Sequence, residues 1–292
     1  MWEVFELQWD KIGYQGMELS DINGIKGKLG KLKEIILAEK SIAIAFSGGI
    51  DSSVVAKVAK NELKNKAIAI TIDSDVFSNK ELKFSKVIAG EIGIKHIIIK
   101  SSKLEDPVFV NNSENRCYHC KGREIELIWQ VAKEHGIKSV AYGVNISDKK
   151  EHRPGIKALM ESNIFFPLEK AGIGKPVMPQ IARYLGLSNY NMPSTTCLAS
   201  RIPYGNKINK EKLIQIEKAE SFLIVLGLSD SRVRHHGDIA RIEVSKNEIE
   251  KIILNKISIV NKFKELGFQY VTLDLQGYRS GSMDEVIKNS GA

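Results

Sequence analysis

The feature that most constrains this chain is a series of short, uninterrupted apolar runs that alternate with helical patterns through its first half. Strands that are apolar without alternation are buried on both faces, as in parallel sheets covered by helices. We expect four such strands, at Ile42–Phe46, Ala67–Ile72, Ile94–Ile99 and Ser139–Gly143. Helices are expected near 51–62, 79–91 and 117–135, after a lead-in helix that ends at Lys40. This order predicts an α/β fold with a doubly wound parallel sheet, whose ligands bind at the carboxyl ends of the strands.

The length of 292 residues allows two domains. From about 150 to 200 the chain is punctuated by prolines and glycines, and we interpret this stretch as loops at a domain junction. Beyond it the patterns predict a helix at 209–226, a strand pair at 232–235 and 239–244, one or two helices within 247–266, and a last strand at 270–275. We therefore expect a first domain over residues 1–195 and a smaller α+β domain over residues 196–292.

Composition and charge narrow the classes of function. The chain has no run of about 18 apolar residues and no basic start followed by a long apolar segment, so we expect a cytoplasmic protein that does not enter a membrane. The 43 lysines and arginines exceed the 35 aspartates and glutamates by 8, which favours a phosphate-bearing ligand or a nucleic acid. Because the excess is spread over both halves, tRNA is not the expected partner.

A glycine-containing loop, Ser47-Gly48-Gly49-Ile50-Asp51-Ser52, follows the first strand and precedes a helix. Adjacent glycines permit a turn with inward-facing N–H groups, and the start of a helix adds partial positive charge, so such a loop can hold a phosphate chain. The plainer alternative is a tight turn in which Ser and Asp only cap the helix. A Walker loop is excluded because no Gly-Lys-Ser/Thr follows, and a dinucleotide fingerprint because its third spaced glycine is missing.

The Ser-Gly-Gly-x-Asp-Ser pattern resembles the signature of the PP-loop ATP pyrophosphatases, which have the adenine nucleotide α-hydrolase-like fold. The resemblance implies that ATP is cleaved between its α and β phosphates and that AMP is placed on a substrate oxygen. It implies that pyrophosphate is held by the loop and that Asp51 binds Mg²⁺. It also implies adenosine contacts at the ends of two further strands. The implied nucleotide-binding residues are Ser47, Gly48, Gly49, Asp51, Ser52, Thr71, Gly143 and Asn145.

Three cysteines raise a separate question. Cys117 and Cys120 form a Cys-x-x-Cys pair, and Cys197 lies in a loop-like stretch before Arg201. An odd, sparse set without an export signal is not a disulfide framework. A redox pair, a zinc site completed by a histidine and a three-cysteine iron–sulfur cluster all remain open.

A narrower resemblance is to the LarE family of sulfur transferases, which act in synthesis of the nickel-pincer nucleotide cofactor. Six motifs follow in the order of that family: Ser47–Ser52, Arg116–Lys121, Arg153–Gly155, Cys197–Gly205, Ile216–Glu220 and Arg232–Arg234. The match covers roughly residues 40 to 245, and the Cys-Leu-Ala-Ser-Arg block is its most specific part.

This resemblance implies an ATP-dependent sulfur transferase that adenylates a carboxylate of pyridinium-3,5-biscarboxylic acid mononucleotide and replaces oxygen by sulfur, releasing AMP and pyrophosphate. Because all three cysteines are present, it implies the version that holds a [4Fe-4S] cluster on Cys117, Cys120 and Cys197. Catalysis is assigned to Cys197 and Asp51. A sulfide or other sulfur donor and a homo-oligomer, a hexamer in the family, are also implied. The implied substrate-binding residues are Arg201, Glu220, Arg232 and Arg234.

Other functions remain open at this point. A PP-loop tRNA thiolase also activates a carbonyl group with ATP and can use three cysteines. An amidating ligase would use the same loop and could hold structural zinc. A nucleotide or metal sensor would bind ATP without forming AMP.

Overall fold

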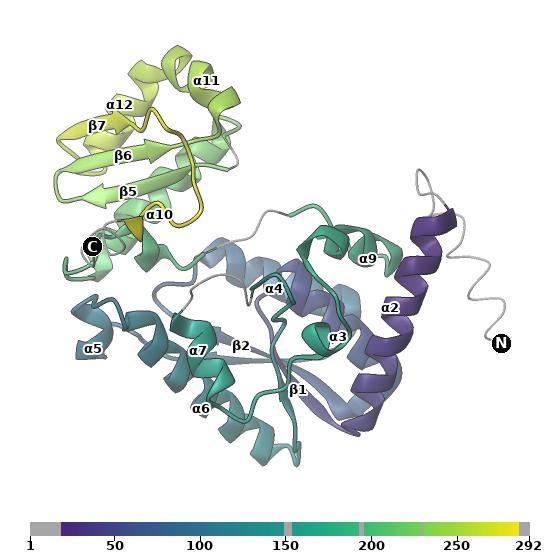
Figure 1. Cartoon of the computed structure of the whole chain (residues 1–292). Helices are drawn as coiled ribbons and strands as arrows, with labels where there is room; N and C mark the ends of the chain where they lie inside the picture. Colours follow the sequence, from purple (N-terminus) through teal and green to yellow (C-terminus); the bar gives the residue numbers. More distant parts are fainter. Residues whose placement is uncertain (1–18, 149–153, 193–195, 229, 286–292) are drawn as a thin grey trace. The chain divides into compact units, whose positions relative to one another are not determined.

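The computed structural model of the protein describes residues 19–148, 154–192, 196–228 and 230–285 (Figure 1). These residues group into two compact units. The first comprises 19–73, 79–101, 118–148 and 154–192, and the second comprises 74–78, 102–117, 196–228 and 230–285. The long segment of the second unit begins at residue 196, and two short earlier segments group with it.

The first unit is built on a four-stranded parallel sheet in the order β3-β2-β1-β4. Its strands are β1 (Ile42–Ala45), β2 (Ala67–Asp73), β3 (Lys95–Lys100) and β4 (Val140–Ala141). The strand order reverses beside β1, because β2 lies on one side of it and β4 on the other. Such a reversal opens a crevice at the carboxyl ends of the two central strands. The predicted doubly wound sheet is confirmed.

Apolar cores cover both faces of this sheet, which explains why its strands are apolar without alternation. On one face, Ile42 and Ile44 pack with residues of α2 (Leu19–Ala38), α3 (Ile50–Leu63), α4 (Asn79–Ile92), α8 (Pro167–Lys170) and α9 (Met178–Tyr184). On the other face, Ala43 and Ile68 pack with α6 (Arg116–Glu134) and α7 (Pro154–Met160). The central strands β1 and β2 with α3 and α6 beside them can be followed in Figure 1.

The stretch from 150 to 200, which we interpreted as loops, contains short helices in its described part. The helices α7 and α8 begin at Pro154 and Pro167, and α9 begins at Met178 just before Pro179, after the 3₁₀ turn η3 (Lys175–Val177). Proline is favoured in the first turn of a helix because the N–H that it lacks would have no intrahelical partner there. The described prolines of this stretch, Pro154, Pro167, Pro176 and Pro179, therefore mark helix starts.

The second unit contains a three-stranded sheet in the order β5-β6-β7, with β5 (Arg232–His236), β6 (Ile239–Glu243) and β7 (Tyr270–Leu273). The strands β5 and β6 are antiparallel, and β6 and β7 are parallel. One face packs on α10 (Lys210–Val225), α11 (Ile249–Leu254) and α12 (Lys256–Glu265) around Phe263 and Phe268. The other face is polar and contacts the segment after β7, where Ser282 bonds to Arg234.

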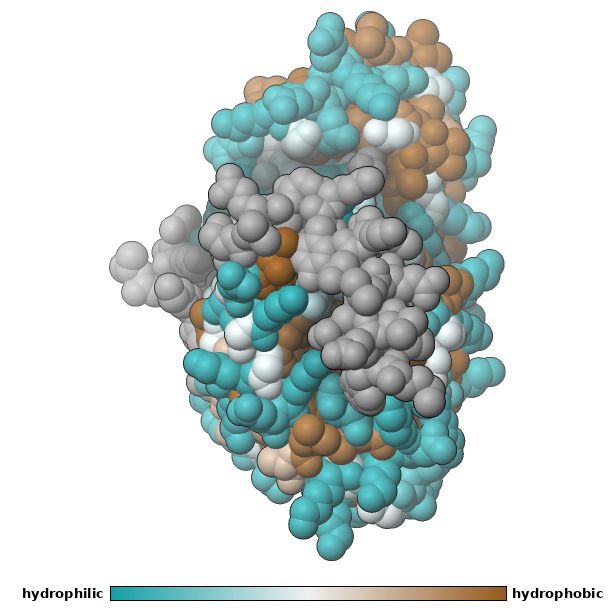
Figure 2. All heavy atoms as spheres, turned by 90° about the vertical axis from the view of Figure 1, so that its right-hand side faces the viewer, coloured by the Kyte–Doolittle hydropathy of each residue, from teal (hydrophilic) through white to brown (hydrophobic). Residues whose placement is uncertain are grey.

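Four short elements complete the description: η1 (Lys64–Lys66), α5 (Pro107–Val110), η4 (Leu198–Arg201) and η5 (Lys246–Glu248). Among the described residues, none of the helices has the length and apolarity needed to cross a membrane. Most of the placed side chains on the face seen in Figure 2 are hydrophilic, with small apolar patches between them.

Candidate functional site

The phosphate loop of the first unit lies between β1 and α3 and has a conformation that requires glycine. Gly48 has φ +77°, a left-handed value, and a Cβ atom there would lie 2.8 Å from the backbone Cα of Ser85. Any side chain at position 48 would be strained and would collide with α4. The backbone geometry therefore requires glycine at position 48, the first glycine of the motif.

Two serines of the loop form a local hydrogen-bond network. The Ser47 and Ser52 hydroxyl oxygens lie 3.2 Å apart, and the Ser47 N–H donates to Ser52 Oγ over 3.3 Å. Gly49 N–H donates to Ser47 Oγ over 3.2 Å, and Ser52 Oγ–H donates to the Gly49 carbonyl over 3.1 Å. Hydroxyl and N–H groups of Ser47, Gly49 and Ser52 are thus gathered at the start of a helix, where an anion is favoured.

The carboxyl end of β4 lies against the phosphate loop. A Cβ atom at Gly143 would lie 2.8 Å from the Ser52 nitrogen, so only glycine fits there. Asn145 is fully buried, and its side-chain amide lies 3.5 Å from Asp51 Oδ1. Gly143 and Asn145 therefore meet the loop at the strand-order reversal, and their predicted contact with adenosine stays a prediction.

Asp51 belongs to a charged group that sequence reasoning identified only in part. The pKa of Asp51 is raised from 3.8 to about 6, chiefly by burial and then by the nearby Asp148 carboxylate, against the lowering effects of Asn145 and Lys175. Lys175 Nζ lies 3.0 Å from Asp148 Oδ1, and Asp148 also accepts from the Asn145 N–H over 3.2 Å. The two carboxylates beside the phosphate loop are oxygen donors of the kind that Mg²⁺ prefers, and the Lys175 ammonium group lies next to them.

Thr71 lies on β2 as predicted, but its hydroxyl is used inside the protein. It donates to the Phe46 carbonyl over 2.6 Å and lies 2.8 Å from His96 Nε2. The side chain is buried, and burial together with Lys86 lowers the pKa of His96. Thr71 therefore ties β2 to the end of β1, and contact with adenosine remains a proposal.

Asn189 is a residue that sequence reasoning missed. Its side-chain amide donates to the Gly48 carbonyl over 2.7 Å and to Ser53 Oγ over 2.9 Å, and the residue is fully buried. A segment more than a hundred positions away therefore holds the phosphate loop. The sequence carries no signal for this contact, because Asn189 lies in none of the motifs.

In the second unit, a buried arginine lies beside two of the three cysteines. Arg116 is 3 % exposed, and its Nη2 lies 3.7 Å from Cys117 Sγ. Burial would lower the pKa of Arg116, but the Cys117 and Cys197 thiols raise it, so both sulfur atoms lie in its field. Arg116 is held by the Asn112 side chain and contacts the ring of Tyr204, 5.5 Å from its guanidinium carbon. Arg116 therefore places a fixed positive charge beside Cys117.

Cys120 lies three positions after Cys117 on α6, but that part of the helix belongs to the first unit. Positions three apart on a helix lie on the same side of it. Cys117 and Cys120 are partly exposed, and Cys197 is exposed. Within the ranges that the structure describes, no three Cys, His, Asp or Glu side chains are gathered as metal ligands.

Arg201 and Glu220, both predicted to bind substrate, bind each other. Arg201 Nε and Nη2 donate to the two Glu220 carboxylate oxygens over 2.9 and 3.1 Å, and Arg201 is 4 % exposed. Arg201 Nη1 also donates to the carbonyls of Thr196 and Cys197. This pair therefore fixes the backbone that carries Cys197.

Arg234 is paired in the same way with a residue outside the predicted set. Its Nε and Nη2 donate to Glu243 Oε2 over 2.9 and 2.6 Å, and Glu243 is fully buried. Arg232 Nη1 donates to the Ser231 carbonyl, and the Arg232 guanidinium lies 5.0 Å from the ring centre of Tyr278. The three arginines predicted to bind a phosphate thus already have partners within the protein.

The asparagine synthase family model matches residues 33–110, which include the phosphate loop. An uncharacterized protein of Synechocystis is 37 % identical over 265 residues, which cover 90 % of this chain and 99 % of that protein. An uncharacterized protein of Methanocaldococcus jannaschii is 34 % identical over 257 residues, 87 % of this chain and 98 % of that protein.

A third relative has a stated activity. The pyridinium-3,5-bisthiocarboxylic acid mononucleotide synthase of Lactiplantibacillus plantarum is 33 % identical over 247 residues. The match covers 84 % of this chain and 90 % of that enzyme. The similarity therefore extends over both units.

Proposed function

This chain belongs to the LarE family of PP-loop ATP pyrophosphatases, and from that premise we propose that it converts a carboxylate of pyridinium-3,5-biscarboxylic acid mononucleotide into a thiocarboxylate. The observation that carries the ATP-dependent half is the loop after β1, whose serines and N–H groups meet Gly143 and Asn145 at the strand-order reversal. Similarity to the Lactiplantibacillus enzyme over both units supports the sulfur-transfer half.

The reaction has two steps, and neither step oxidises or reduces the substrate or the sulfur. A substrate carboxylate oxygen attacks the α-phosphorus of ATP, the bond to the β-phosphate breaks, and pyrophosphate leaves. A sulfide then attacks the acyl carbon, and the bond to AMP breaks. Two rounds give the bis-thiocarboxylate. Holding both reactants in one site can contribute about 7–11 kcal/mol to lowering the barrier.

The first unit supplies the groups for adenylation. Its loop N–H groups and the Ser47 and Ser52 hydroxyls bind the phosphates that become pyrophosphate. Asp51, with Asp148 beside it, fits Mg²⁺ because the two carboxylates otherwise repel each other. Lys175, which reaches Asp148 from the start of η3, is placed to neutralise phosphate charge. When bound, Mg²⁺ screens the triphosphate from the incoming carboxylate.

The cysteines fit a [4Fe-4S] cluster by their donor chemistry. Cys117 and Cys120 share one turn of α6, Cys197 shares the field of Arg116 with Cys117, and thiolates are the usual cluster ligands. When bound through three cysteines, such a cluster keeps one iron open for the sulfur to be transferred. Arg116 holds the thiols near a positive charge, and the Arg201–Glu220 pair holds the backbone of Cys197. A sulfide donor and assembly into a homo-oligomer are part of the proposal.

The test is reconstitution under exclusion of oxygen. We expect the purified protein to contain about four iron atoms and to form AMP and thiocarboxylate from ATP, sulfide and the dicarboxylate mononucleotide through many turnovers. The product and the mass of Cys197 are followed by mass spectrometry. AMP formation without thiocarboxylate, or thiolated nucleosides after incubation with tRNA, would contradict the proposed function.

Cysteine variants separate the possible sulfur sources. We expect Cys117→Ala to lose iron and repeated turnover, whereas His119→Ala, a matched change on the same helical turn, keeps both. Retained turnover in Cys117→Ala, with dehydroalanine at position 197, would instead indicate that the sulfur of Cys197 is consumed. Zinc that is lost in His119→Ala would indicate a structural zinc site.

A further inference from the structure

The second unit buries several arginines, and one of them differs from the others in its partners. Arg116 is 3 % exposed, slightly less than Arg201 and Arg234, which are 4 and 5 % exposed. Arg201 holds the carboxylate of Glu220, and Arg234 holds that of Glu243. Within the ranges that the structure describes, Arg116 is paired with no carboxylate. Because burying a cation without a negative partner is costly, its surroundings must supply negative charge in another form.

The guanidinium of Arg116 is held in place by neutral groups. Its Nη1 donates to the side-chain oxygen of Asn112 and, over 3.4 Å, to the Ala199 carbonyl. The ring centres of Phe109 and Tyr204 lie 5.9 and 5.5 Å from the guanidinium carbon, within the range of cation–π contacts. These contacts fix the position of the charge, but they bring no full negative charge to it.

The groups beside Arg116 that can become negative are cysteine sulfurs. Arg116 Nη2 lies 3.7 Å from Cys117 Sγ. Burial would lower the pKa of Arg116, but Cys117 and Cys197 raise it, which places both sulfur atoms in its field. A thiol has no net charge, whereas a cysteine that binds iron does so as a thiolate. The charge of the buried arginine is therefore balanced when these sulfurs are metal ligands.

The place of Arg116 in its helix supports the same conclusion. Arg116 is the first residue of α6, and Cys117 is the second. The start of a helix carries partial positive charge, so a cation is unfavourable there and a negative group is favoured. The arginine and the helix start thus bring two positive charges to Cys117, an arrangement that the stability of the helix alone disfavours.

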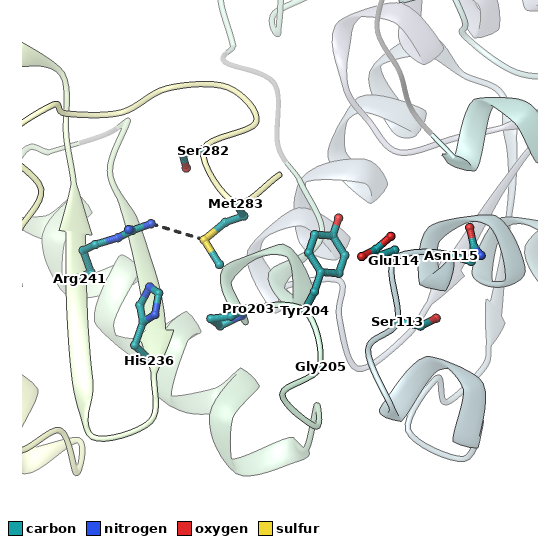
Figure 3. A pocket seen from close by; sticks show the side chains of 10 residues that line it. All are labelled: Ser113, Glu114, Asn115, Pro203, Tyr204, Gly205, His236, Arg241, Ser282 and Met283. Carbon is teal, nitrogen blue, oxygen red and sulfur yellow. Dashed lines mark hydrogen bonds between the residues drawn. The ribbon is translucent and has the colours of Figure 1, made fainter. Parts of the chain in front are cut away.

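The aromatic neighbour of Arg116 borders a cavity of about 640 Å³ within the second unit (Figure 3). Tyr204 lines this cavity together with Glu114 and Asn115, which directly precede Arg116 in the chain. The Tyr204 hydroxyl donates to Asp284 Oδ1 over 2.9 Å, so the ring is held at its hydroxyl as well as by the guanidinium. Arg116 is not among the described residues that line the cavity, so its charge acts on the sulfurs rather than on a ligand there.

We propose that Arg116 is a positioning residue for sulfur transfer, which balances the negative charge of Cys117 and Cys197 when they bind an iron–sulfur cluster. This inference rests on the proposed function and deepens it. Arg116 takes part through the cysteines, whereas the charges of Arg201 and Arg234 are balanced by carboxylates of the protein. A smaller negative charge at the sulfurs also lets an anionic sulfur donor and a phosphate-bearing substrate approach.

Redox titration of the cluster-loaded protein, followed by electron paramagnetic resonance, tests the inference. The net charge around a cluster and the hydrogen bonds to its sulfurs help to set its reduction potential. We therefore expect the midpoint potential of Arg116→Met to be more negative than that of wild type, and the potential of Arg116→Lys to lie closer to wild type. Arg279→Met removes the same charge elsewhere in this unit and should leave the potential unchanged.

The dependence of the rate on sulfide is a second measurement on the same variants. We expect Arg116→Met to raise the sulfide concentration at half-maximal rate about 10-fold, while the half-saturating concentration of ATP stays unchanged. ATP is bound by the loop of the first unit in our proposal, so a variant that only loosened the fold would alter both values.

Equal midpoint potentials in Arg116→Met, Arg279→Met and wild type would overturn the inference, as would the same potential in Arg116→Lys and Arg116→Met. If Arg116→Met does not fold by circular dichroism or binds no iron, wild-type protein labelled with ¹⁵N-arginine decides. Pulsed electron paramagnetic resonance of its reduced cluster should then detect a coupled arginine nitrogen. The absence of such a coupling would overturn the inference.

Failure of the proposed function is distinguishable from failure of this inference. A wild-type protein that shows the expected shift but forms no thiocarboxylate would contradict the function alone. Thiocarboxylate formation with equal potentials in all variants would contradict the inference alone. A wild-type protein without iron after reconstitution would contradict the inference together with the cluster-dependent part of the function.

Discussion

The phosphate loop and the arginine-bearing sheet face use charge in opposite ways. In the loop, burial and the Asp148 carboxylate raise the pKa of Asp51, and N–H groups gather at the start of α3. On the sheet face, Arg234 lies against the fully buried Glu243, and in the same unit Arg201 holds Glu220. In our proposal the groups of the first region bind a ligand, whereas most charges of the second region already have partners within the protein. The residues of a motif alone therefore do not reveal whether its charged side chains can bind a ligand or are already paired within the protein.

The largest expected effect comes from breaking the completed region. Glu243→Gln leaves Arg234 and Arg241 without their shared carboxylate in a buried position, and we expect the free energy of unfolding to fall by about 3–5 kcal/mol. The measurement is urea denaturation followed by circular dichroism. Glu285→Gln, which removes an exposed partner of Arg279, should leave stability unchanged. Equal stability of Glu243→Gln and wild type would mean that the arginines are available after all.

A smaller effect is expected from releasing the phosphate loop. Asn189→Ala removes the two hydrogen bonds to the Gly48 carbonyl and Ser53 Oγ, and we expect a loss of about 1–3 kcal/mol in stability together with weaker ATP binding. Asn191→Ala is the matched change at an exposed neighbour. Urea denaturation and titration with a non-hydrolysable ATP analogue measure the two quantities. Unchanged nucleotide affinity in Asn189→Ala would show that the loop keeps its shape without this clamp.

The smallest effect is a pH dependence with a definite sign. Burial and Asp148 raise the pKa of Asp51, so the folded protein binds this proton more tightly than the unfolded chain does. Asp51 therefore contributes stability that is present below about pH 4 and is lost as the pH rises through about 6. In metal-free buffer, Asp51→Asn should become more stable than wild type by about 1–2 kcal/mol between pH 4 and 7. Urea denaturation at a series of pH values measures the difference.

Asp75 in the second unit provides the opposite case. Burial would raise its pKa, but hydrogen bonds from the Ser102 hydroxyl and from backbone N–H groups lower it. Its stabilising contribution is therefore present above the usual pKa of an aspartate and is lost as the pH falls. As the pH rises, Asp75→Asn should lose stability relative to wild type, whereas Asp51→Asn should gain it. If the stability difference from wild type changed with pH in the same direction for both variants, the contrast between the two regions would be wrong.

The parts of the fold and site that could be predicted are those encoded by neighbouring residues. The strands beginning at Ile42 and Ala67 and the loop from Ser47 to Ser52 were recognisable because apolar runs and glycine pairs act locally. The strand expected at 139–143 is only two residues long, and Pro154 and Pro167 start helices within the stretch that we interpreted as loops. In residues 150–200 the spacing of prolines and glycines alone could not distinguish the start of a helix from a loop.

The parts that could not be predicted depend on contacts between distant segments. Asn189, Glu243 and Asp148 carry no motif of their own, and each acquires its role from a partner on another element. The sequence offered one hint that these arginines are paired. Glu243 directly follows Ile242 and lies opposite Arg232 in the β5–β6 register. An arginine cluster in a sequence is therefore better interpreted once the acidic residues on the paired strand are counted.

The interleaving of the two units has a consequence for dissecting the protein. Residues 74–78 and 102–117 group with the second unit, and the amide of Asn112 donates to the carbonyls of Pro203 and Asn206. A fragment that starts at residue 196 would lack these supports, and one that stops at 195 would expose the segments left behind. We therefore expect neither fragment to fold on its own, so a recombination event or gene fusion would have to include the entire chain.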